Sequence, residues 1–294
     1  RNLKPTFAII DSIQAINNDE MESAPGSVSQ VRSCSSELQN FAKENNIALL
    51  IIGHVTKDGA LAGPKTLEHL VDVVMNFEGD HISSHRLLRS VKNRFGATFE
   101  IGIFEMLENG LQEVKNPSSI FTNKENIAGV ATTITNEGSR PFAVDIQALI
   151  NKTFYNNPRR TTTGININRL HQILAVIEKH LGIKLSDYDC YIATGGGFEI
   201  NDPSADLGVA ISILSSLKNI PPNLNSAYVG ELGLSGQVRQ TNNLRAKLEE
   251  AVRLGIKNIL VPKIDSKLIH NFSNLINIKE ISHINEAINY SFKE

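Results

Sequence analysis

The stretch that decides the fold of the first part of the chain is Phe7-Ala8-Ile9-Ile10-Asp11-Ser12, an apolar run that ends on a carboxylate and a hydroxyl. Its β-rich composition predicts a strand. Apolar and small residues then recur at helical spacing from Val28 to Lys43, and Ser27 or Ser29 can cap that helix. The continuous apolar run from Ile47 to Gly53 is typical of a strand buried on both faces of a parallel sheet. Strand, helix and strand in this order predict an α/β domain.

The boundaries of two domains follow from the elements further along. Arg86–Lys92 and Glu100–Met106 read as strands, and Gly110 marks a hairpin turn. The segment Asn116–Asn126 is polar and contains Pro117, which is typical of a linker. We therefore expect the back half of an α/β domain over residues 1–116, a linker over 117–126 and a second domain over 127–294.

The second domain mixes strands and helices without strict alternation, which predicts an α+β fold. Its helices are expected to be amphipathic or, for the middle one, buried nearly all round. The expected strands are Val130–Thr135, Pro141–Ile150 and Cys190–Thr194, and the expected helices are Arg169–Leu181, Ala205–Leu217 and Leu244–Leu254.

Composition limits the class of protein. The chain has 294 residues, is 41% hydrophobic and 20% charged, and carries a formal net charge of −2, so it reads as soluble and globular without a global basic field. Cys34 and Cys190 are far apart and lack CxxC spacing, which predicts neither a disulfide framework nor a zinc site and suits a reducing cytosol. The longest apolar run, Ile47 to Ile52, is far shorter than the ~20 residues of a membrane helix. We expect a cytoplasmic protein without a membrane partner.

Two strand ends bring polar side chains that suit nucleotide chemistry. Asp11 closes an apolar strand, the form of a Walker B element, where a carboxylate holds the water shell of Mg²⁺ beside nucleotide phosphates. His54 follows the apolar run that ends at Gly53, and is expected at the same sheet edge, where it can sense the terminal phosphate. The alternatives are a carboxylate at an ordinary turn and a histidine that only hydrogen-bonds there.

A pair of cations, Lys92 and Arg94, flanks Asn93 in the sequence Ser90-Val-Lys-Asn-Arg-Phe-Gly96. Alternate positions of a strand send their side chains to one face. Such a pair can clamp a phosphate, and a guanidinium can do so with two hydrogen bonds. The alternative is a solvated surface.

Taken together, these segments resemble the RadA/Sms family of bacterial DNA repair ATPases in order and spacing. The matching segments are Asp11–Ala15, Ser23–Arg32, Gly53–Gly59, Gly63–Pro64, Leu67–Asp72 and Lys92–Gly96, the last being the motif that marks the family. The resemblance covers nearly all of the chain. It implies a RecA-like fold and a homohexameric ring similar to DnaB-type helicases. It also implies a DNA-dependent ATPase and branch-migration helicase that uses ATP and Mg²⁺ in DNA repair and homologous recombination. The implied partners are single-stranded or branched DNA and a RecA-type recombinase.

The same resemblance assigns roles to individual residues. Asp11, Ser12, Lys92 and Arg94 would contact nucleotide, and His54 would act with Asp11, Lys92 and Arg94 in catalysis. Lys92 and Arg94 would reach the nucleotide of the neighbouring subunit. The segments Val28–Arg32 and Gly59–Lys65 would face the DNA channel. The expected DNA-binding residues are Arg32, Lys57, Lys65, Arg159 and Arg160.

The second domain resembles the proteolytic domain of Lon, and so implies a ribosomal S5 domain 2-like fold. Asp202-Pro-Ser204-Ala-Asp206 falls on the Lon nucleophile motif, and the Lon general-base lysine falls on Arg245. An arginine stays protonated and takes no proton from a serine, while Lys247 is expected on a different helix face. We expect a degenerate protease site, with Ser204 as the cap or in the first turn of a helix. The alternatives to an ATPase are a non-catalytic, ring-forming, DNA-binding scaffold and a Ser-Lys peptidase.

The family resemblance also predicts what this chain alone does with ATP. The family carries an amino-terminal zinc finger and a P-loop ending in Gly-Lys-Ser/Thr, and neither is in the 294 residues. We interpret the chain as a truncated fragment, in which zinc would belong only to the missing finger. We expect it to show no ATPase turnover, with or without single-stranded DNA, because no loop cradles the phosphates. A phosphate-release assay that finds turnover abolished by Asp11→Asn would contradict this.

Overall fold

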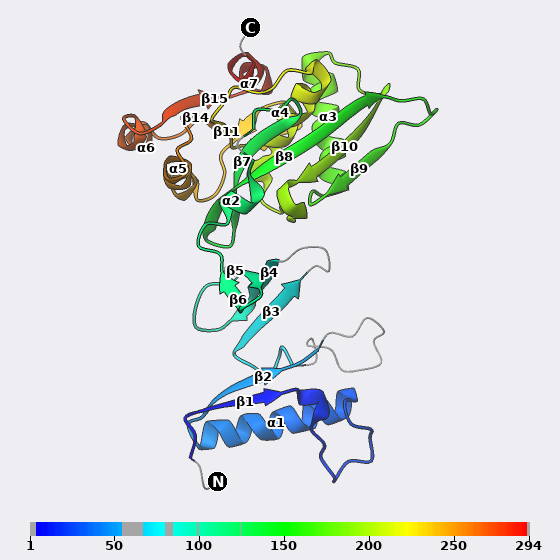
Figure 1. Cartoon of the computed structure of the whole chain (residues 1–294), viewed down its shortest axis with the longest axis vertical. Coiled ribbons are helices and arrows are strands. Elements are labelled where there is room, and N and C mark those ends of the chain that lie inside the picture. Colours follow the sequence, from blue (N-terminus) through cyan, green and yellow to red (C-terminus); the bar gives the residue numbers. More distant parts are fainter. Residues whose placement is uncertain (1–3, 55–66, 80–84, 99, 124, 293–294) are drawn as a thin grey trace. The chain divides into compact units, whose positions relative to one another are not determined.

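The structure is a computed structural model that describes residues 4–54, 67–79, 85–98, 100–123 and 125–292 (Figure 1). The chain forms two compact units. Unit 1 comprises Arg1–Phe77 and Arg89–Phe99, and unit 2 comprises Glu78–Leu88 and Glu100–Glu294. The chain passes between the units after Phe77 and Leu88, within the third and fourth strands, and again after Phe99, whereas the sequence predicts a boundary at residue 116.

Unit 1 begins with a strand–helix–strand segment, as the sequence predicts. Strand β1 (Phe7–Asp11), helix α1 (Val28–Glu44) and strand β2 (Ala48–Ile52) follow one another, with the short 3-10 helix η1 (Ile13–Ala15) after β1. The two strands are parallel, and Asp11 is the register partner of Ile52. Ser27 caps α1 by accepting a hydrogen bond from the backbone N–H of Gln30. The predicted helix, its cap and both strands are confirmed.

Among the described residues, strands β1 and β2 are covered on one face only. Val31 and Cys34 of α1 and Ile13 form a small core with partly buried Ile51. On the other face the side chains of Phe7, Ile9 and Leu50 are exposed at 54%, 55% and 46%. The prediction that the second strand is buried on both faces was wrong for this chain, since α1 packs against one side.

A second sheet has four strands in the order β3-β4-β5-β6. Their bounds are β3 (Val73–Gly79), β4 (His85–Asn93), β5 (Ile101–Leu107) and β6 (Gly110–Glu113). Strands β5 and β6 form an antiparallel hairpin in which Leu107 pairs with Gly110. Gly110 has a φ of +103°, a left-handed conformation that favours glycine, and the predicted hairpin turn is confirmed.

Unit 2 is built on a seven-stranded mixed sheet in the order β15-β14-β11-β7-β8-β10-β9. The long central strands β7 (Val130–Glu137) and β8 (Arg140–Lys152) are antiparallel, and β10 (Tyr188–Thr194) is antiparallel to β8. The strands β9 (Arg160–Thr163), β11 (Ser226–Tyr228), β14 (Asn258–Pro262) and β15 (Asn277–Ile281) pair in parallel with their neighbours. A mixed sheet with interspersed helices fits the α+β expectation.

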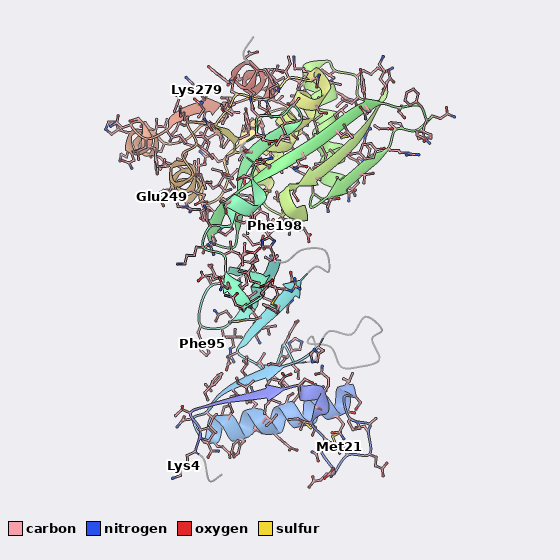
Figure 2. The ribbon with its side chains drawn as sticks, in the orientation of Figure 1. Lys4, Met21, Phe95, Phe198, Glu249 and Lys279 are labelled. Atoms are coloured by element: carbon pink, nitrogen blue, oxygen red, sulfur yellow. The ribbon has the colours of Figure 1, made fainter. Side chains whose placement is uncertain are left out.

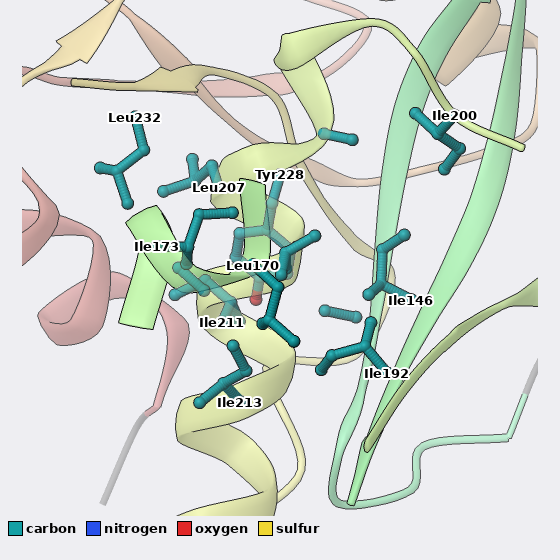
Figure 3. Packing of buried hydrophobic residues seen from close by; sticks show 14 of the residues in the cluster. Ile146, Leu170, Ile173, Ile192, Ile200, Leu207, Ile211, Ile213, Tyr228 and Leu232 are labelled. Carbon is teal, nitrogen blue, oxygen red and sulfur yellow. The ribbon is translucent and has the colours of Figure 1, made fainter. Parts of the chain in front are cut away.

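The helices of unit 2 bury their apolar faces against this sheet. They are α3 (Ile167–Leu181), α4 (Asp206–Lys218), α5 (Leu244–Arg253), α6 (Ser266–Phe272) and α7 (Ile284–Ser291). Leu170 and Ile173 of α3 pack with Leu207 and Ile211 of α4 and with Ile146 of β8, as the close view in Figure 3 shows. The three predicted helices are confirmed, and α4 is buried nearly all round. Short elements complete the unit: η3 (Gly195–Gly197), η4 (Pro203–Ala205), β12 (Glu231–Leu232) and β13 (Val238–Arg239).

The segment expected to be a linker is instead packed into unit 2. It contains the one-turn helix α2 (Ser118–Phe121). The Phe121 ring is 5% exposed and lies 5.8 Å from the Phe142 ring and 5.2 Å from the Phe198 ring, centre to centre. Ser118 Oγ donates a hydrogen bond of 2.7 Å to Glu250 Oε1. Burial of one aromatic ring fixes this otherwise polar segment. Within the described residues, no helix is both long and apolar enough to span a membrane.

Each unit contains one buried cysteine, and we expect these thiols to report separately on unfolding. Burial raises the pKa of Cys34 in unit 1, and raises the pKa of Cys190 in unit 2 to about 11. Thiolates are therefore scarce at pH 8, and a maleimide pulse should leave both unlabelled in the folded chain. Because unit 1 has the smaller core, Cys34 should become reactive at a lower urea concentration than Cys190. Mass spectrometry of tryptic peptides measures both, and coincident labelling would contradict two independent units.

Candidate functional site

The expected nucleotide residues of unit 1 meet at one edge of the β1–β2 sheet. Asp11 ends β1 opposite Ile52 of β2, and His54 lies two residues beyond Ile52. Gln14 Nε2 of η1 donates a hydrogen bond of 3.2 Å to the backbone carbonyl of His54, which ties the two strand ends together. Ser12 follows directly and caps η1 in an extended conformation. The parallel register therefore brings Asp11, Ser12 and His54 to the same edge.

Asp11 is exposed at this edge and is available to a ligand. Among the described residues, no cation forms a salt bridge with its carboxylate. An exposed carboxylate at the carboxyl end of a strand suits the water shell of Mg²⁺, which keeps most of its waters and binds one or two carboxylates. Among the described residues, no group of three or more metal-ligating side chains forms here, so this single carboxylate could hold only an ion whose other ligands are water or nucleotide phosphates.

Lys92 and Arg94 both contact the segment just before β3. Lys92 Nζ donates hydrogen bonds to the backbone carbonyls of Glu68 (2.6 Å) and Val71 (2.8 Å). Arg94 Nη1 lies 3.0 Å from Asp72 Oδ1, in an ion pair whose side chains are 64% and 42% exposed. Lys92 therefore fixes the backbone just before β3. The exposed ion pair between Arg94 and Asp72 contributes only ~0–1 kcal/mol to stability, so Arg94 can readily bind another partner.

Phe95, which follows Arg94, is 82% exposed and is labelled in Figure 2. The Lys92–Gly96 motif thus presents a guanidinium and an apolar ring next to each other at the end of β4. Sequence reasoning singled out the cations and gave no role to this ring.

The expected DNA-binding residues have different environments. Arg32 is exposed on α1. Lys57 and Lys65 lie outside the described residues. Arg160 is held internally, because its guanidinium donates to the backbone carbonyls of Tyr188 and Leu185. Arg159 stays on the surface.

Ser204 of unit 2 lies in η4, directly before α4, and is fully buried. Its hydroxyl donates to the carbonyl of Ile134 at 3.4 Å, and its backbone N–H donates to Asp202 Oδ1 at 2.9 Å. Asp202 is therefore the cap of this turn. Ser204 occupies the first turn, one of the two placements expected from the sequence.

The cation that faces this turn is Lys247 and not Arg245. Arg245 is 70% exposed and pairs with Glu249 one helical turn away at 3.0 Å. Lys247 is fully buried, and its Nζ donates to Asp202 Oδ2 at 2.7 Å. Lys247 thus lies on a different face of α5 from Arg245, as its spacing predicts, and the match of Arg245 to the Lon general-base lysine stays a prediction. The signal was in the sequence, because Leu244, Lys247 and Leu248 share one stripe of α5 by their spacing.

Asp202 gathers three donors, namely Lys247 Nζ and the backbone N–H groups of Ser204 and Asn136 (3.0 Å). Burial alone would raise the pKa of Asp202, but attraction to Lys247 and the hydrogen bonds outweigh it and lower the pKa. The carboxylate is therefore ionised. Burial lowers the pKa of Lys247, although the charge of Asp202 and its hydrogen bond oppose this shift. In its ammonium form, paired with Asp202, Lys247 cannot act as a base.

A second ion pair lies on the other side of Ser204. Arg169 of α3 binds the Asp206 carboxylate with Nε at 2.8 Å and also with Nη2, and the backbone N–H of Leu232 donates to Asp206 Oδ2 at 3.0 Å. The sequence predicts only a helix that begins near Arg169 and gives no role to its guanidinium. The two aspartates that flank Ser204 are thus each neutralised by a cation, one from α3 and one from α5.

Comparison with known proteins finds a matching family model for part of unit 2 and relatives that match most of the chain. The family described as Lon protease (S16) C-terminal proteolytic domain matches residues 178–294. The DNA repair protein RadA of Synechocystis is 53% identical over 263 residues, which cover 89% of this chain and 52% of that protein. The RadA proteins of Bacillus subtilis and Streptococcus pneumoniae are 47% and 48% identical, over 89% of this chain and 58% and 63% of their own lengths. The chain spans between half and two thirds of these relatives.

The contact between Lys247 and Asp202 gives a matched pair of variants on α5. Lys247→Met should lower the free energy of unfolding of unit 2 by ~3–5 kcal/mol, because it leaves a buried carboxylate without its cation. Arg245→Met on the exposed face should change it by less than about 0.5 kcal/mol. Urea unfolding followed by circular dichroism measures both.

A double variant separates this ion pair from simple packing. Asp202→Asn combined with Lys247→Met should destabilise unit 2 by less than the sum of the two single changes, since neither charge is then left unpaired. Strictly additive effects would show that the pair is not coupled.

Proposed function

Since the chain belongs to the RadA family of DNA repair proteins, we propose that the complete protein is a DNA-dependent ATPase that drives branch migration of recombination intermediates. In this proposal unit 1 is part of a RecA-like nucleotide-binding core, and unit 2 is a Lon-like scaffold. The observation that carries it is the common edge formed by Asp11, Ser12 and His54 at the carboxyl ends of two parallel strands. Open α/β sheets bind ligands at that edge.

The roles of these residues follow from their positions. Asp11 would hold the water shell of Mg²⁺ beside ATP, with Ser12 next to it, and His54 would respond to the terminal phosphate. Bound Mg²⁺ would supply charge neutralisation of the phosphates. Gln14, which joins the two strand ends, would transmit a shift of one strand end to the other. This last role makes Gln14 a positioning residue and not a catalytic one.

Lys92 and Arg94 would serve the nucleotide of a neighbouring subunit in a homohexamer. In support of this role, Arg94 is held only by the exposed carboxylate of Asp72, so a phosphate can compete for it. Lys92 is bound to two backbone carbonyls and would keep the end of β4 in place. An ammonium has three donors, so one remains for a phosphate oxygen.

The proposed setting is the bacterial cytoplasm, where the protein would act on single-stranded or branched DNA together with a RecA-type recombinase. ATP and Mg²⁺ would be its cofactors, and zinc would bind only outside this chain. Arg32, Lys57, Lys65, Arg159 and Arg160 remain the proposed DNA contacts, with Arg160 acting through the backbone that it holds.

A second candidate function for unit 2 is a non-catalytic scaffold for ring assembly and DNA binding. The two ion pairs beside Ser204 favour it, because they use Lys247 and Arg169 to neutralise Asp202 and Asp206. Peptidase activity would need Lys247 to leave Asp202, lose a proton to become neutral and then take the proton of Ser204. A serine-directed acylating probe should therefore leave Ser204 unmodified.

We expect Arg94→Ala to remove most ATPase turnover of the complete, P-loop-containing protein while nucleotide binding is retained, because trans-acting arginines contribute ~10³–10⁵ in rate. Steady-state phosphate release measures turnover. Arg245→Ala is the matched control, since Arg245 is also an exposed arginine paired with a carboxylate.

Mixed rings test whether Arg94 acts across a subunit boundary. Subunits with Arg94→Ala should regain partial activity when assembled with subunits carrying Asp11→Asn, because some interfaces then contain one intact copy of each group. If co-assembled rings recover nothing, the role of Arg94 at a neighbour's nucleotide is wrong, and a DNA contact replaces it.

A further inference from the structure

The Arg94 side chain of the Lys92–Gly96 motif lies against a carboxylate of its own chain. Arg94 Nη1 is 3.0 Å from Asp72 Oδ1, and the backbone N–H of Arg94 donates to the carbonyl of Asp72 at 3.1 Å. The two side chains are 64% and 42% exposed. The Arg169–Asp206 pair is different, because it uses two nitrogens of the guanidinium and its carboxylate is 4% exposed. The Arg94–Asp72 pair is therefore a weak contact that water and salt can reach.

The turn Leu67–Asp72, which ends on this carboxylate, is fixed to the rest of unit 1. Lys92 Nζ donates hydrogen bonds to two of its backbone carbonyls, at 2.6 and 2.8 Å. Gln39 Nε2 of helix α1 donates to a third backbone carbonyl of the turn. The first residue of the turn, Leu67, packs against the small core beside α1. The carboxylate is therefore carried by a backbone that stays in place whether or not the arginine is bound to it.

The backbone of Arg94 is fixed as well. The side chain of Asn93 closes the turn that follows β4, because its Oδ1 accepts from the backbone N–H of Phe95 at 3.1 Å. Its Nδ2 donates to the carbonyl of Ala97 at 3.3 Å. With the backbone held in this way, the guanidinium of Arg94 moves by rotation about the bonds of its long side chain. The arginine thus combines a fixed backbone with a movable charge.

A phosphate and the Asp72 carboxylate compete for this movable charge. A guanidinium binds a phosphate through two parallel hydrogen bonds, whereas the ion pair here joins one nitrogen to one oxygen. A terminal phosphate also carries more negative charge than a carboxylate. The carboxylate is therefore strong enough to hold the arginine when no phosphate is near, and weak enough to lose it when a phosphate comes within reach.

We propose that Asp72 is a positioning residue that holds Arg94 in a resting ion pair, which the terminal phosphate of a nucleoside triphosphate displaces before the arginine acts. The inference rests on the proposed function and adds a restraining contact to the same site. It predicts that removal of the carboxylate frees the arginine and speeds turnover. An orienting role, in which Asp72 aims Arg94 at the phosphate, predicts slower turnover instead.

Steady-state phosphate release by the complete, P-loop-containing protein measures the direction of this effect. Asp72→Asn should raise kcat between about twofold and fivefold, the size expected for loss of an exposed ion pair. KM for ATP should stay unchanged, because the arginine acts on charge that develops in the transition state. Asp72→Glu keeps the charge and should restore kcat to within about twofold of the unaltered protein. Asp187→Asn is the matched control, since Asp187 is also an exposed aspartate and pairs with Lys184 at 3.1 Å.

A transition-state analogue separates release of the arginine from a general loosening of the turn. Asp72→Asn should tighten the binding of fluorescently labelled ADP with aluminium fluoride by the same factor as it raises kcat, and leave the binding of ADP alone unchanged. In a protein that already carries Arg94→Ala, the same change should affect neither kcat nor analogue binding, because the two residues act through one contact. A loosened turn would weaken both instead.

The possible failures of this inference and of the proposed function are distinct. If Arg94→Ala retains full turnover, the proposed role of Arg94 fails and the inference fails with it. If Arg94→Ala is inactive while Asp72→Asn lowers kcat or leaves it unchanged, the inference alone is overturned. A gain in kcat that persists alongside Arg94→Ala also overturns it, because Asp72 then acts through another group. Should circular dichroism show that Asp72→Asn is unfolded, Asp72→Ser removes the same charge and carries the same expectations.

Discussion

The contact between the Asp202 carboxylate and the Lys247 ammonium is the interaction on which the packing of unit 2 depends. It joins η4, which opens the buried helix α4, to α5 and, through the backbone of Asn136, to β7. The Arg169–Asp206 pair does the same between α4 and α3. Removing charges from water is costly, so each carboxylate here is tolerated only with its cation and its backbone donors in place. Three helices and the central strands are thereby held in one arrangement.

This charge network also bears on the proposal that unit 2 is a scaffold and not a peptidase. A nucleophilic serine needs a neighbouring base that is neutral before the reaction. In unit 2 the lysine next to the serine turn is bound by an ionised carboxylate, so the group that could supply a base instead serves as a tie between helices. The ammonium of Lys247 donates its hydrogen bond to Asp202 and not to Ser204, so in this arrangement it contributes to packing.

Periodicity in the sequence was sufficient to find the strands β1 and β2, the helix α1 and the three long helices of unit 2, because each of these elements repeats its own pattern. What the sequence could not supply was the environment of single side chains. Phe121 sits in a polar segment, and only the rings of Phe142 and Phe198 show why that segment is not a linker. The placement of Asp11 and His54 at one edge of the sheet was predictable, because the register of two parallel strands alone determines it. For α5, the motif resemblance drew attention to the exposed Arg245, whereas the helical stripe through Leu244 and Leu248 indicated that Lys247 is the buried cation.

The apolar face of β1 and β2, exposed as far as residues 4–54 and 67–79 describe it, has a consequence for how the chain behaves in solution. Phe7, Ile9 and Leu50 form a flat apolar surface on a two-stranded sheet, which is the kind of surface that recruits further strands or a second sheet. Adhesion between such faces rises with protein concentration and with kosmotropic salts, which strengthen apolar burial. Net charge near neutrality offers little electrostatic repulsion against it. Unit 1 therefore limits the colloidal stability of the chain as well as its folding free energy.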